Sequence, residues 1–305
     1  MPATTHLPQP SPVSAAAQTN ALTVDVEDYF QVSAFDDLVD RDDWDAFESR
    51  VESSTDRLLQ TFADADVRGT FFILGWVAQR HPELVRRIAA AGHELASHGY
   101  HHRLVYDITP DAFRHDLTRS RDAIQQAAGV AVTAYRAPSF SINRRSLWAL
   151  DILAELGFTV DSSIFPIHHD RYGMPDARRE PHEIETAAGT LTEFPPSVWQ
   201  LGRFNIPIAG GGYFRLYPLT LTLRGLAAVN ARRMPFMFYL HPWEVDPEQP
   251  RMRPLGWKTR FRHYVGLPRT QAKLSRLLRA AHFDTLTNTL SQYRQNHQLT
   301  TVQHT

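Results

Sequence analysis

From residue 21 onward, short apolar runs alternate with stretches in which apolar residues recur every three to four positions. Seven of the runs have the length and the β-branched or aromatic content of buried strands: 21–24, 69–76, 94–96, 133–135, 158–160, 190–194 and 235–240. Helical spacing covers four stretches between them: 51–67, 82–91, 110–128 and 145–156. This alternation predicts an α/β fold with parallel strands joined by crossover helices.

Unusual polar residues follow one predicted strand after another. In folds of this kind the carboxyl ends of the strands lead into the loops that carry chemistry, so these residues are expected to converge at one end of the sheet. They are Asp25, Glu27 and Asp28 after the first strand, His98 and His102 after the third, Arg136 after the fourth, Asp161 after the fifth and His241 after the last.

Two of these residues, His98 and His102, are four positions apart where an apolar run ends. On a helical turn this spacing places two imidazoles on one face, close enough to bind one ion. Zn²⁺ and its neighbours accept imidazole nitrogen, and a hydrolytic site usually adds a carboxylate and leaves a position for water. The alternative is that both are surface histidines, in a chain that carries 15.

Composition narrows the classes of function. The chain has 305 residues, 43% of them hydrophobic, which is enough to bury a sizeable core. Its formal net charge of -1 gives no basic footprint for nucleic acid. No cysteine is present, so a metal would need His and carboxylate ligands. No apolar run reaches the roughly 18 residues of a membrane helix, which predicts a cytoplasmic protein without a membrane span.

The ends of the chain differ from its middle in composition. Residues 1–20 are rich in Pro, Ala, Ser, Thr and Gln and lack the apolar core of a secretory signal, so they are predicted to form a disordered tail. Residues 291–305 are predicted to form a polar C-terminal tail. A single domain is expected over residues 21–290.

Five short motifs resemble, in order, those of the polysaccharide deacetylases with a NodB-homology domain, carbohydrate esterase family 4. They are TVDVED at 23–28, HGYHH at 98–102, RAPSF at 136–140, DSS at 161–163 and LHP at 240–242. Three further segments resemble a bacterial subgroup associated with exopolysaccharide biosynthesis and exosortase systems: VDVEDYFQV at 24–32, GGYFR at 211–215 and HPWE at 241–244. The resemblance implies a single-domain distorted (β/α)7-type barrel.

The same resemblance implies a role for each motif. His98 and His102 would hold a divalent metal, most consistent with Zn²⁺, together with an acid of the first motif. Asp25 would be the general base, and Arg136 would keep it ionised. His241 would protonate the leaving nitrogen. Asp161 would bind the far nitrogen of that ring, although a plain turn role beside two serines is equally open.

The metal-binding acid is ambiguous, because the family's first motif has two adjacent Asp residues and this chain does not. Strand alternation puts Asp25 and Glu27 on one side and favours Glu27, whereas a turn at Val26 would present Asp28. Asp28 is slightly preferred for its shorter side chain.

Sugar contacts are expected from Tyr213 and Trp243, whose rings can stack on pyranose faces, and from Pro138 of the third motif. The resulting prediction is an N-deacetylase acting on an N-acetylated glycan of a bacterial exopolysaccharide or its lipid-linked precursor, in association with the biosynthetic machinery. Two alternatives remain: an amidohydrolase for a small cyclic amide, and a non-catalytic carbohydrate-binding protein.

Overall fold

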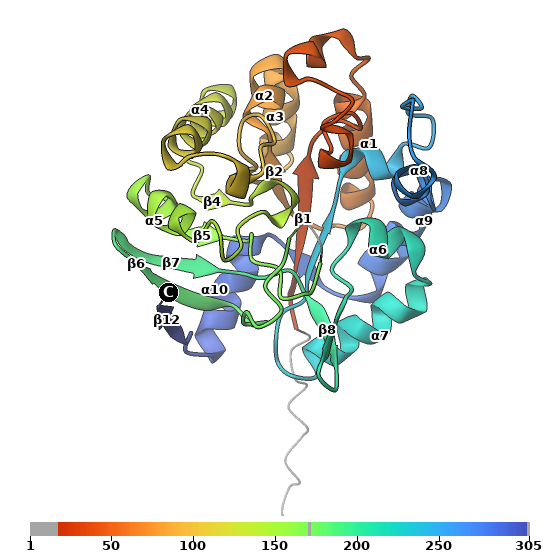
Figure 1. The fold of residues 1–305 in the computed structure, drawn as a ribbon. Helices are drawn as coiled ribbons and strands as arrows, with labels where there is room; N and C mark the ends of the chain where they lie inside the picture. The colour runs from red at the N-terminus through yellow and green to blue at the C-terminus, as the bar shows by residue number, and fades with distance from the viewer. Residues whose placement is uncertain (1–17, 170–171, 304–305) are drawn as a thin grey trace, which may run out of the picture.

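The computed structural model describes residues 18–169 and 172–303, and its centre is one large sheet surrounded by helices (Figure 1). The strands of this sheet are β1 (Asn20–Val26), β2 (Thr70–Ile73), β3 (Glu94–Ser97), β4 (Ala134–Tyr135), β5 (Val160–Asp161), β6 (His182–Thr186), β7 (Gly189–Glu193), β10 (Met237–Leu240), β11 (Phe283–Asp284) and β12 (Thr301–Gln303). A separate hairpin consists of β8 (Val198–Leu201) and β9 (Phe204–Pro207).

The strand order is β10-β1-β2-β3-β4-β5-β7-β6-β12, with β11 paired to the start of β1. All of these pairs are parallel except β6 with β7. The predicted α/β fold with a parallel sheet is therefore confirmed. Within the described residues no ladder joins β10 to the far edge at β12, so the arrangement is compatible with a distorted barrel of the (β/α)7 type but is not hydrogen-bonded all the way round.

Ten α-helices lie in the described part of the chain: α1 (Val51–Ala63), α2 (Gly75–Arg80), α3 (Pro82–Ala90), α4 (Pro110–Ala128), α5 (Trp148–Glu155), α6 (Gly211–Leu216), α7 (Leu219–Asn230), α8 (Trp257–Tyr264), α9 (Leu267–Ala280) and α10 (Leu286–Asn296). Short 3-10 turns are η1 (Ser33–Phe35), η2 (Arg41–Ala46), η3 (Val105–Asp107), η4 (Pro138–Phe140) and η5 (Pro242–Val245). None of these helices combines the length and the apolar content needed to cross a membrane.

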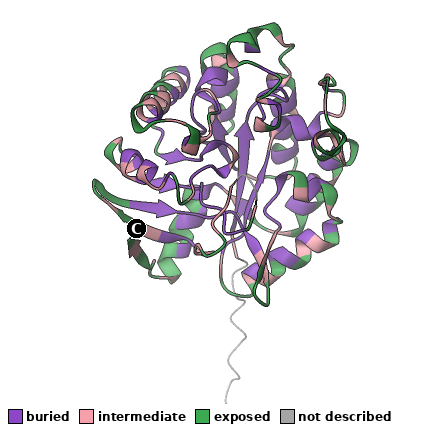
Figure 2. Cartoon of the chain, viewed as in Figure 1, coloured by how far each residue is buried: buried purple, intermediate pink, exposed green. Residues whose placement is uncertain are grey.

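The core lies between the sheet and the helices, and β1 runs through it (Figure 2). Every residue of β1 is buried, as expected for a strand covered on both faces. The helix predicted over residues 110–128 is confirmed as α4. Its N-terminus is capped by Thr109 Oγ1, which accepts from the backbone N–H of Ala112, and it ends at Gly129, whose φ of 70° suits glycine.

Three predicted elements differ from the structure by three residues or more. One is the helix expected over 51–67, which ends at Ala63. The apolar run 69–76 divides into β2 and the start of α2, because the chain turns at Leu74. A Cβ on Gly75 would lie 2.5 Å from the Tyr100 ring and 2.6 Å from the Ser120 backbone, so glycine permits the close contact of α2 with α4. The helix predicted over 145–156 begins only at Trp148.

The predictions for the two ends of the chain compare differently with the structure. The predicted disordered tail falls mostly on residues 1–17, which lie outside the described residues. Within the stretch predicted as a polar tail, residues 291–296 complete α10 and β12 pairs with β6. The polar composition reflects the exposed edge position of β12, whose residues are mostly exposed.

Candidate metal and catalytic site

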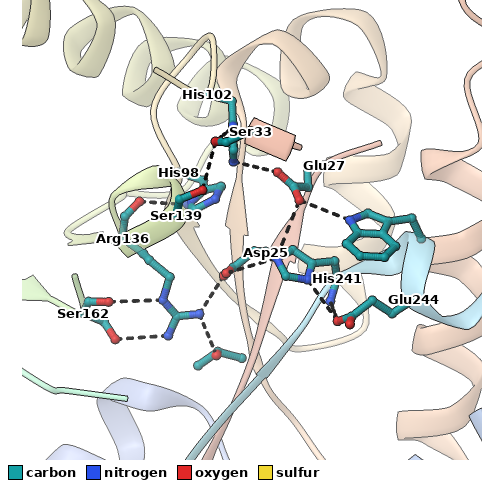
Figure 3. A network of polar contacts seen from close by, with 12 residues as sticks. Asp25, Glu27, Ser33, His98, His102, Arg136, Ser139, Ser162, His241 and Glu244 are labelled. Atoms are coloured by element: carbon teal, nitrogen blue, oxygen red, sulfur yellow. Dashed lines mark hydrogen bonds and ion pairs between the residues drawn. The ribbon is translucent and has the colours of Figure 1, made fainter. Parts of the chain in front are cut away.

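The carboxyl end of β1 carries two acids into the centre of the molecule. Asp25 belongs to the strand and Glu27 follows directly after it, and both are almost fully buried. Glu27 lies beside His98 and His102, with one potential ligand atom from each of the three residues within 4.8 Å of the others (Figure 3). The structure thus brings together the two predicted histidines and one of the two candidate acids.

The histidines lie in the loop after β3 and not on a helical turn, so that part of the prediction is wrong. Gly99 has a φ of 76° and His102 a φ of 51°, and these left-handed residues fold the loop back on itself. The Asp116 carboxylate of α4 holds the loop by accepting from the backbone N–H groups of Tyr100 and His101. The two imidazole rings are 5.4 Å apart, centre to centre.

The polar contacts leave metal-binding atoms available. His98 Nδ1 donates to the backbone carbonyl of Arg136 at 2.8 Å, so its Nε2 carries the free lone pair. Burial lowers the pKa of His98 to about 4, which keeps the ring neutral. His102 Nε2 lies 2.8 Å from Glu27 Oε2. Burial alone would raise the pKa of Glu27, but His102 and His241 lower it to about 2. Two imidazoles and one carboxylate suit Zn²⁺.

Asp28 has a different role in this structure. Its Oδ2 accepts hydrogen bonds from Ser49 Oγ and from the backbone N–H groups of Arg50 and Val51, and its Oδ1 accepts from the N–H of Tyr29. Asp28 therefore binds the start of α1 from a distance in sequence, as an N-terminal cap does. The slight preference for Asp28 over Glu27 as metal ligand is not supported by this geometry.

Asp25 forms a buried ion pair with Arg136, as the resemblance implied. Arg136 Nη1 donates to Asp25 Oδ1 at 2.6 Å and to Thr23 Oγ1 at 2.8 Å. The other side of the guanidinium donates to the carbonyl and the hydroxyl of Ser162. Arg136 is completely buried and lies over the ring of Phe72. These contacts hold the Asp25 carboxylate in one orientation.

His241 faces the two acids of β1 from the end of β10. Its Nε2 lies 3.9 Å from Asp25 Oδ2 and 3.6 Å from Glu27 Oε1, and 18% of its side chain remains exposed. Its Nδ1 lies 3.0 Å from Glu244 Oε2, and Glu244 also accepts from Arg215 Nε at 2.5 Å. Burial would lower the pKa of His241, but the three surrounding carboxylates raise it to about 9.

The expected contact between Asp161 and His241 is therefore replaced by Glu244. Asp161 instead accepts from Ser163 Oγ at 2.5 Å and lies beside Glu193, its register partner in the parallel pair β5 and β7. Burial raises the pKa of both carboxyl groups, and the proximity of Asp161 raises that of Glu193 further, so the pair retains a proton. Asp161 supports the loop below Arg136 and does not reach the histidine.

A cavity of about 240 Å³ opens onto this cluster. It is lined by the acids and histidines described above, by Trp243, and by Val32, Ser139 and Phe140 of the motif segments. The other lining residues were not singled out by sequence patterns: Ser33, Ala34, His169, Tyr172, Tyr239, Thr259, Arg262 and His263. Tyr213 and Pro138, expected as sugar contacts, are not among the lining residues.

Trp243 is held in place by its neighbours. Its Nε1 donates to Glu27 Oε1 at 3.2 Å, and its ring stacks between His241 and His263, with centroid distances of 5.2 and 4.4 Å. The ring is buried, so its flat faces are occupied by imidazoles. Trp243 thus positions Glu27 and His241, and because it also lines the cavity, its role as a sugar contact stays a prediction.

Three residues of this network were missed from the sequence: Glu244, Arg215 and Asp116. The sequence could have predicted the role of Glu244, because it follows His241 by three residues and one turn of helix returns it to that ring. Arg215 comes from α6, 29 positions before the acid it binds, and Asp116 comes from the middle of α4. Arg215 belongs to the segment at 211–215, but no local pattern indicates what Arg215 or Asp116 binds, because their partners lie on other elements.

Comparison with known proteins matches two family models to consecutive parts of the chain. Residues 31–160 match the family described as polysaccharide deacetylase, and residues 162–291 match a domain of unknown function, DUF3473. In structure, the chain resembles a putative polysaccharide deacetylase from Mycobacterium smegmatis, with a TM-score of 0.63 and 23% identity over 98% of this chain and 99% of that one. This likeness confirms the fold.

Similar curated proteins include a peptidoglycan-N-acetylglucosamine deacetylase from Bacillus cereus, 31% identical over 98 residues, which is 32% of this chain and 36% of the relative. A chitooligosaccharide deacetylase from Rhizobium leguminosarum bv. trifolii is 29% identical over 114 residues, 37% of this chain and 49% of the relative. The chain thus spans between a third and a half of these relatives. Its likeness to polysaccharide deacetylases is carried by residues 31–160, which match that family model.

Proposed function

We propose that the protein is a metal-dependent N-deacetylase that removes acetyl groups from the amino sugars of a bacterial exopolysaccharide or of its lipid-linked precursor. The observation that carries this proposal is the meeting of three groups in one cavity: the cluster of Glu27, His98 and His102, the pair of Asp25 with Arg136, and His241. The deacetylase relatives support the reaction class.

Glu27, His98 and His102 would hold the metal, most consistent with Zn²⁺, because a ring nitrogen of each histidine lies close to the Glu27 carboxylate. A bound divalent cation would polarise the acetamide carbonyl and lower the pKa of water toward about 7. Asp28 is not a metal ligand in this proposal, because its carboxylate binds the start of α1. The pairing of Trp243 with Glu27 fixes the carboxylate from the other side.

Asp25 is the proposed general base, which accepts the proton of the attacking water. Arg136 donates to this carboxylate at 2.6 Å and holds it in place at the cavity. His241 is the proposed general acid, which donates its proton to the leaving sugar nitrogen. Part of its raised pKa comes from Glu27, whose charge a bound cation would offset, so Glu244 is the partner that keeps the ring protonated at neutral pH.

The substrate class rests on motif resemblance. The segments at 24–32, 211–215 and 241–244 support a place in exopolysaccharide biosynthesis, and with it a cytoplasmic location and association with that machinery. In this structure the second and third segments meet, because Arg215 binds Glu244. Residues of the resembling segments therefore build the histidine environment that the proposed reaction needs.

The test is acetate release from N-acetylglucosamine oligomers and from the native polymer, with and without a chelator. Activity should disappear with chelator and return with Zn²⁺. His98→Ala should abolish turnover, whereas His115→Ala, which removes an exposed histidine of α4, should not affect it. Release that persists in chelator, or in His98→Ala, would contradict the proposal.

A further inference from the structure

A long stretch near the C-terminus departs from the nearly neutral charge of the whole chain. Residues 249–283 contain no Asp or Glu but nine Lys or Arg residues, whereas the chain as a whole has a net charge of -1. Five of the nine lie in or just before α8 and are exposed: Arg251, Arg253, Lys258, Arg260 and Arg262. The charge is therefore concentrated on one part of the surface.

These cations are not neutralised within the molecule. In the part of the chain that the structure describes, no ion pair involves any of the five. Arg251 lies over the ring of Tyr264 at 4.1 Å, which orients its guanidinium without cancelling the charge. The positive field of this surface is thus directed to solvent, where it can attract an anionic partner.

Two large aromatic side chains stand on the same surface. Trp257 is 76% exposed and Phe261, one helical turn later, is 54% exposed. They line an open hollow of about 560 Å³ together with Arg251 and Arg260. Exposed aromatic residues this close together are unusual on a monomeric protein and mark contact surfaces. Figure 1 places α8 at the outer edge of the molecule, and Figure 2 shows its outer side exposed.

The inner side of the same helix belongs to the candidate site. His263 is buried against Trp243, and Thr259, Arg262 and His263 line the 240 Å³ cavity. A partner bound to the outer side of α8 would therefore lie next to the mouth of that cavity.

We propose that α8 and the loop before it dock onto an anionic membrane surface. A short helix with Trp and Phe on one side and Lys and Arg beside them fits the interface of a bilayer, where the rings insert among the headgroups and the cations contact lipid phosphates. The charge complementarity selects an anionic surface, and two protruding rings beside the cations match the headgroup layer of a bilayer, where rings insert and cations meet lipid phosphates. Docking brings the cavity mouth to the membrane face.

The experiment is flotation of the full chain with vesicles of phosphatidylcholine alone or with phosphatidylglycerol at 3:1. We expect binding to the anionic vesicles that weakens as salt rises. Trp257→Ala with Phe261→Ala should weaken it at least tenfold. Lys258→Glu with Arg260→Glu should weaken it by more than the roughly fivefold per cation typical of anionic surfaces.

Matched controls come from other elements of the molecule. Phe204→Ala removes a 60% exposed ring of β9, and Arg224→Glu reverses an exposed charge of α7. Both should leave vesicle binding unchanged. Equal binding by the wild type and both α8 variants would overturn the proposal. So would binding to a dissolved anionic polysaccharide with none to the vesicles, which would make this surface a glycan contact. Neither result depends on the deacetylase reaction.

Discussion

At the scale of single residues, the site depends on which atoms each side chain leaves free after its structural contacts are made. His98 uses Nδ1 on a backbone carbonyl and keeps Nε2 for the cavity. Asp28 uses Oδ2 on the start of α1 and Oδ1 on the N–H of Tyr29, whereas neighbouring Glu27 points to the histidines. The sequence predicted two histidines and an acid of the first motif at one place, and the structure brings such a set together. Only the hydrogen-bond partners separate a metal-binding acid from a helix-capping one.

Replacement of the acid behind His241 tests its proposed role at the same scale. Glu244→Gln removes the charge at Nδ1, so the pKa of His241 should fall and the ring should lose its proton at lower pH. The alkaline limb of the kcat/KM profile should then move down by about one unit or more. A pH profile of acetate release measures this shift.

The control is Glu248→Gln, which removes an exposed carboxylate four residues later and should leave the profile in place. An unchanged alkaline limb in Glu244→Gln, with normal thermal unfolding, would exclude Glu244 as the partner that sets the proton affinity of His241.

At the scale of elements, the strand register decides which side chains meet. β5 and β7 are parallel neighbours, and their register places Asp161 opposite Glu193. The sequence predicted both strands but not their pairing, because β6 intervenes in the chain as an antiparallel hairpin partner of β7. The sequence therefore predicted His241 as the partner of Asp161, whereas the structure places Glu193 beside it.

This acid pair makes stability depend on pH in a definite direction. Burial raises both pKa values above those of the unfolded chain, so the folded pair binds a proton that the unfolded chain releases. The contribution of this pair to the free energy of unfolding is fully present below about pH 4. It is lost as pH rises through about 6 and beyond, where the buried pair must lose its proton. Glu193→Gln should thus stabilise the protein by about 1–3 kcal/mol at pH 8 and have little effect at pH 4.

Chemical denaturation at the two pH values measures this difference. Glu185→Gln, an exposed acid of the adjacent β6, provides the matched control and should change neither value. Equal stability of Glu193→Gln and wild type at pH 8 would contradict the prediction, because it would mean that ionising the buried pair does not lower the free energy of unfolding.

At the scale of the whole molecule, the site is assembled from distant parts of the chain. β10 lies beside β1, which brings His241 to Asp25 and Glu27, while β3 and β4 bring the histidines and Arg136 from the other side. A metal held by Glu27, His98 and His102 would therefore tie β1 to the loop after β3. Folding and metal binding would be coupled through this contact.

Thermal unfolding with Zn²⁺ measures that coupling. At a hundredfold excess over Kd the metal should stabilise the wild type by about 2.7 kcal/mol and raise Tm. Glu27→Gln should remove most of this increase. Asp28→Asn should lower the starting stability by about 0.5–2 kcal/mol, the usual cost of a lost cap, yet keep the increase. An increase lost in Asp28→Asn and kept in Glu27→Gln would reverse the assignment of the two acids.

By itself, the sequence determined the α/β alternation, α4 with both of its ends, and the set of polar residues at the strand ends, because hydrophobic period, capping residues and glycine stops act locally. Only the tertiary structure decided which acid faces His98 and His102, which carboxylate supports His241, and that residues 291–303 belong to the fold. Those outcomes depend on strand pairing and on left-handed residues in a loop, where partners far apart in the chain compete for the same oxygens and nitrogens.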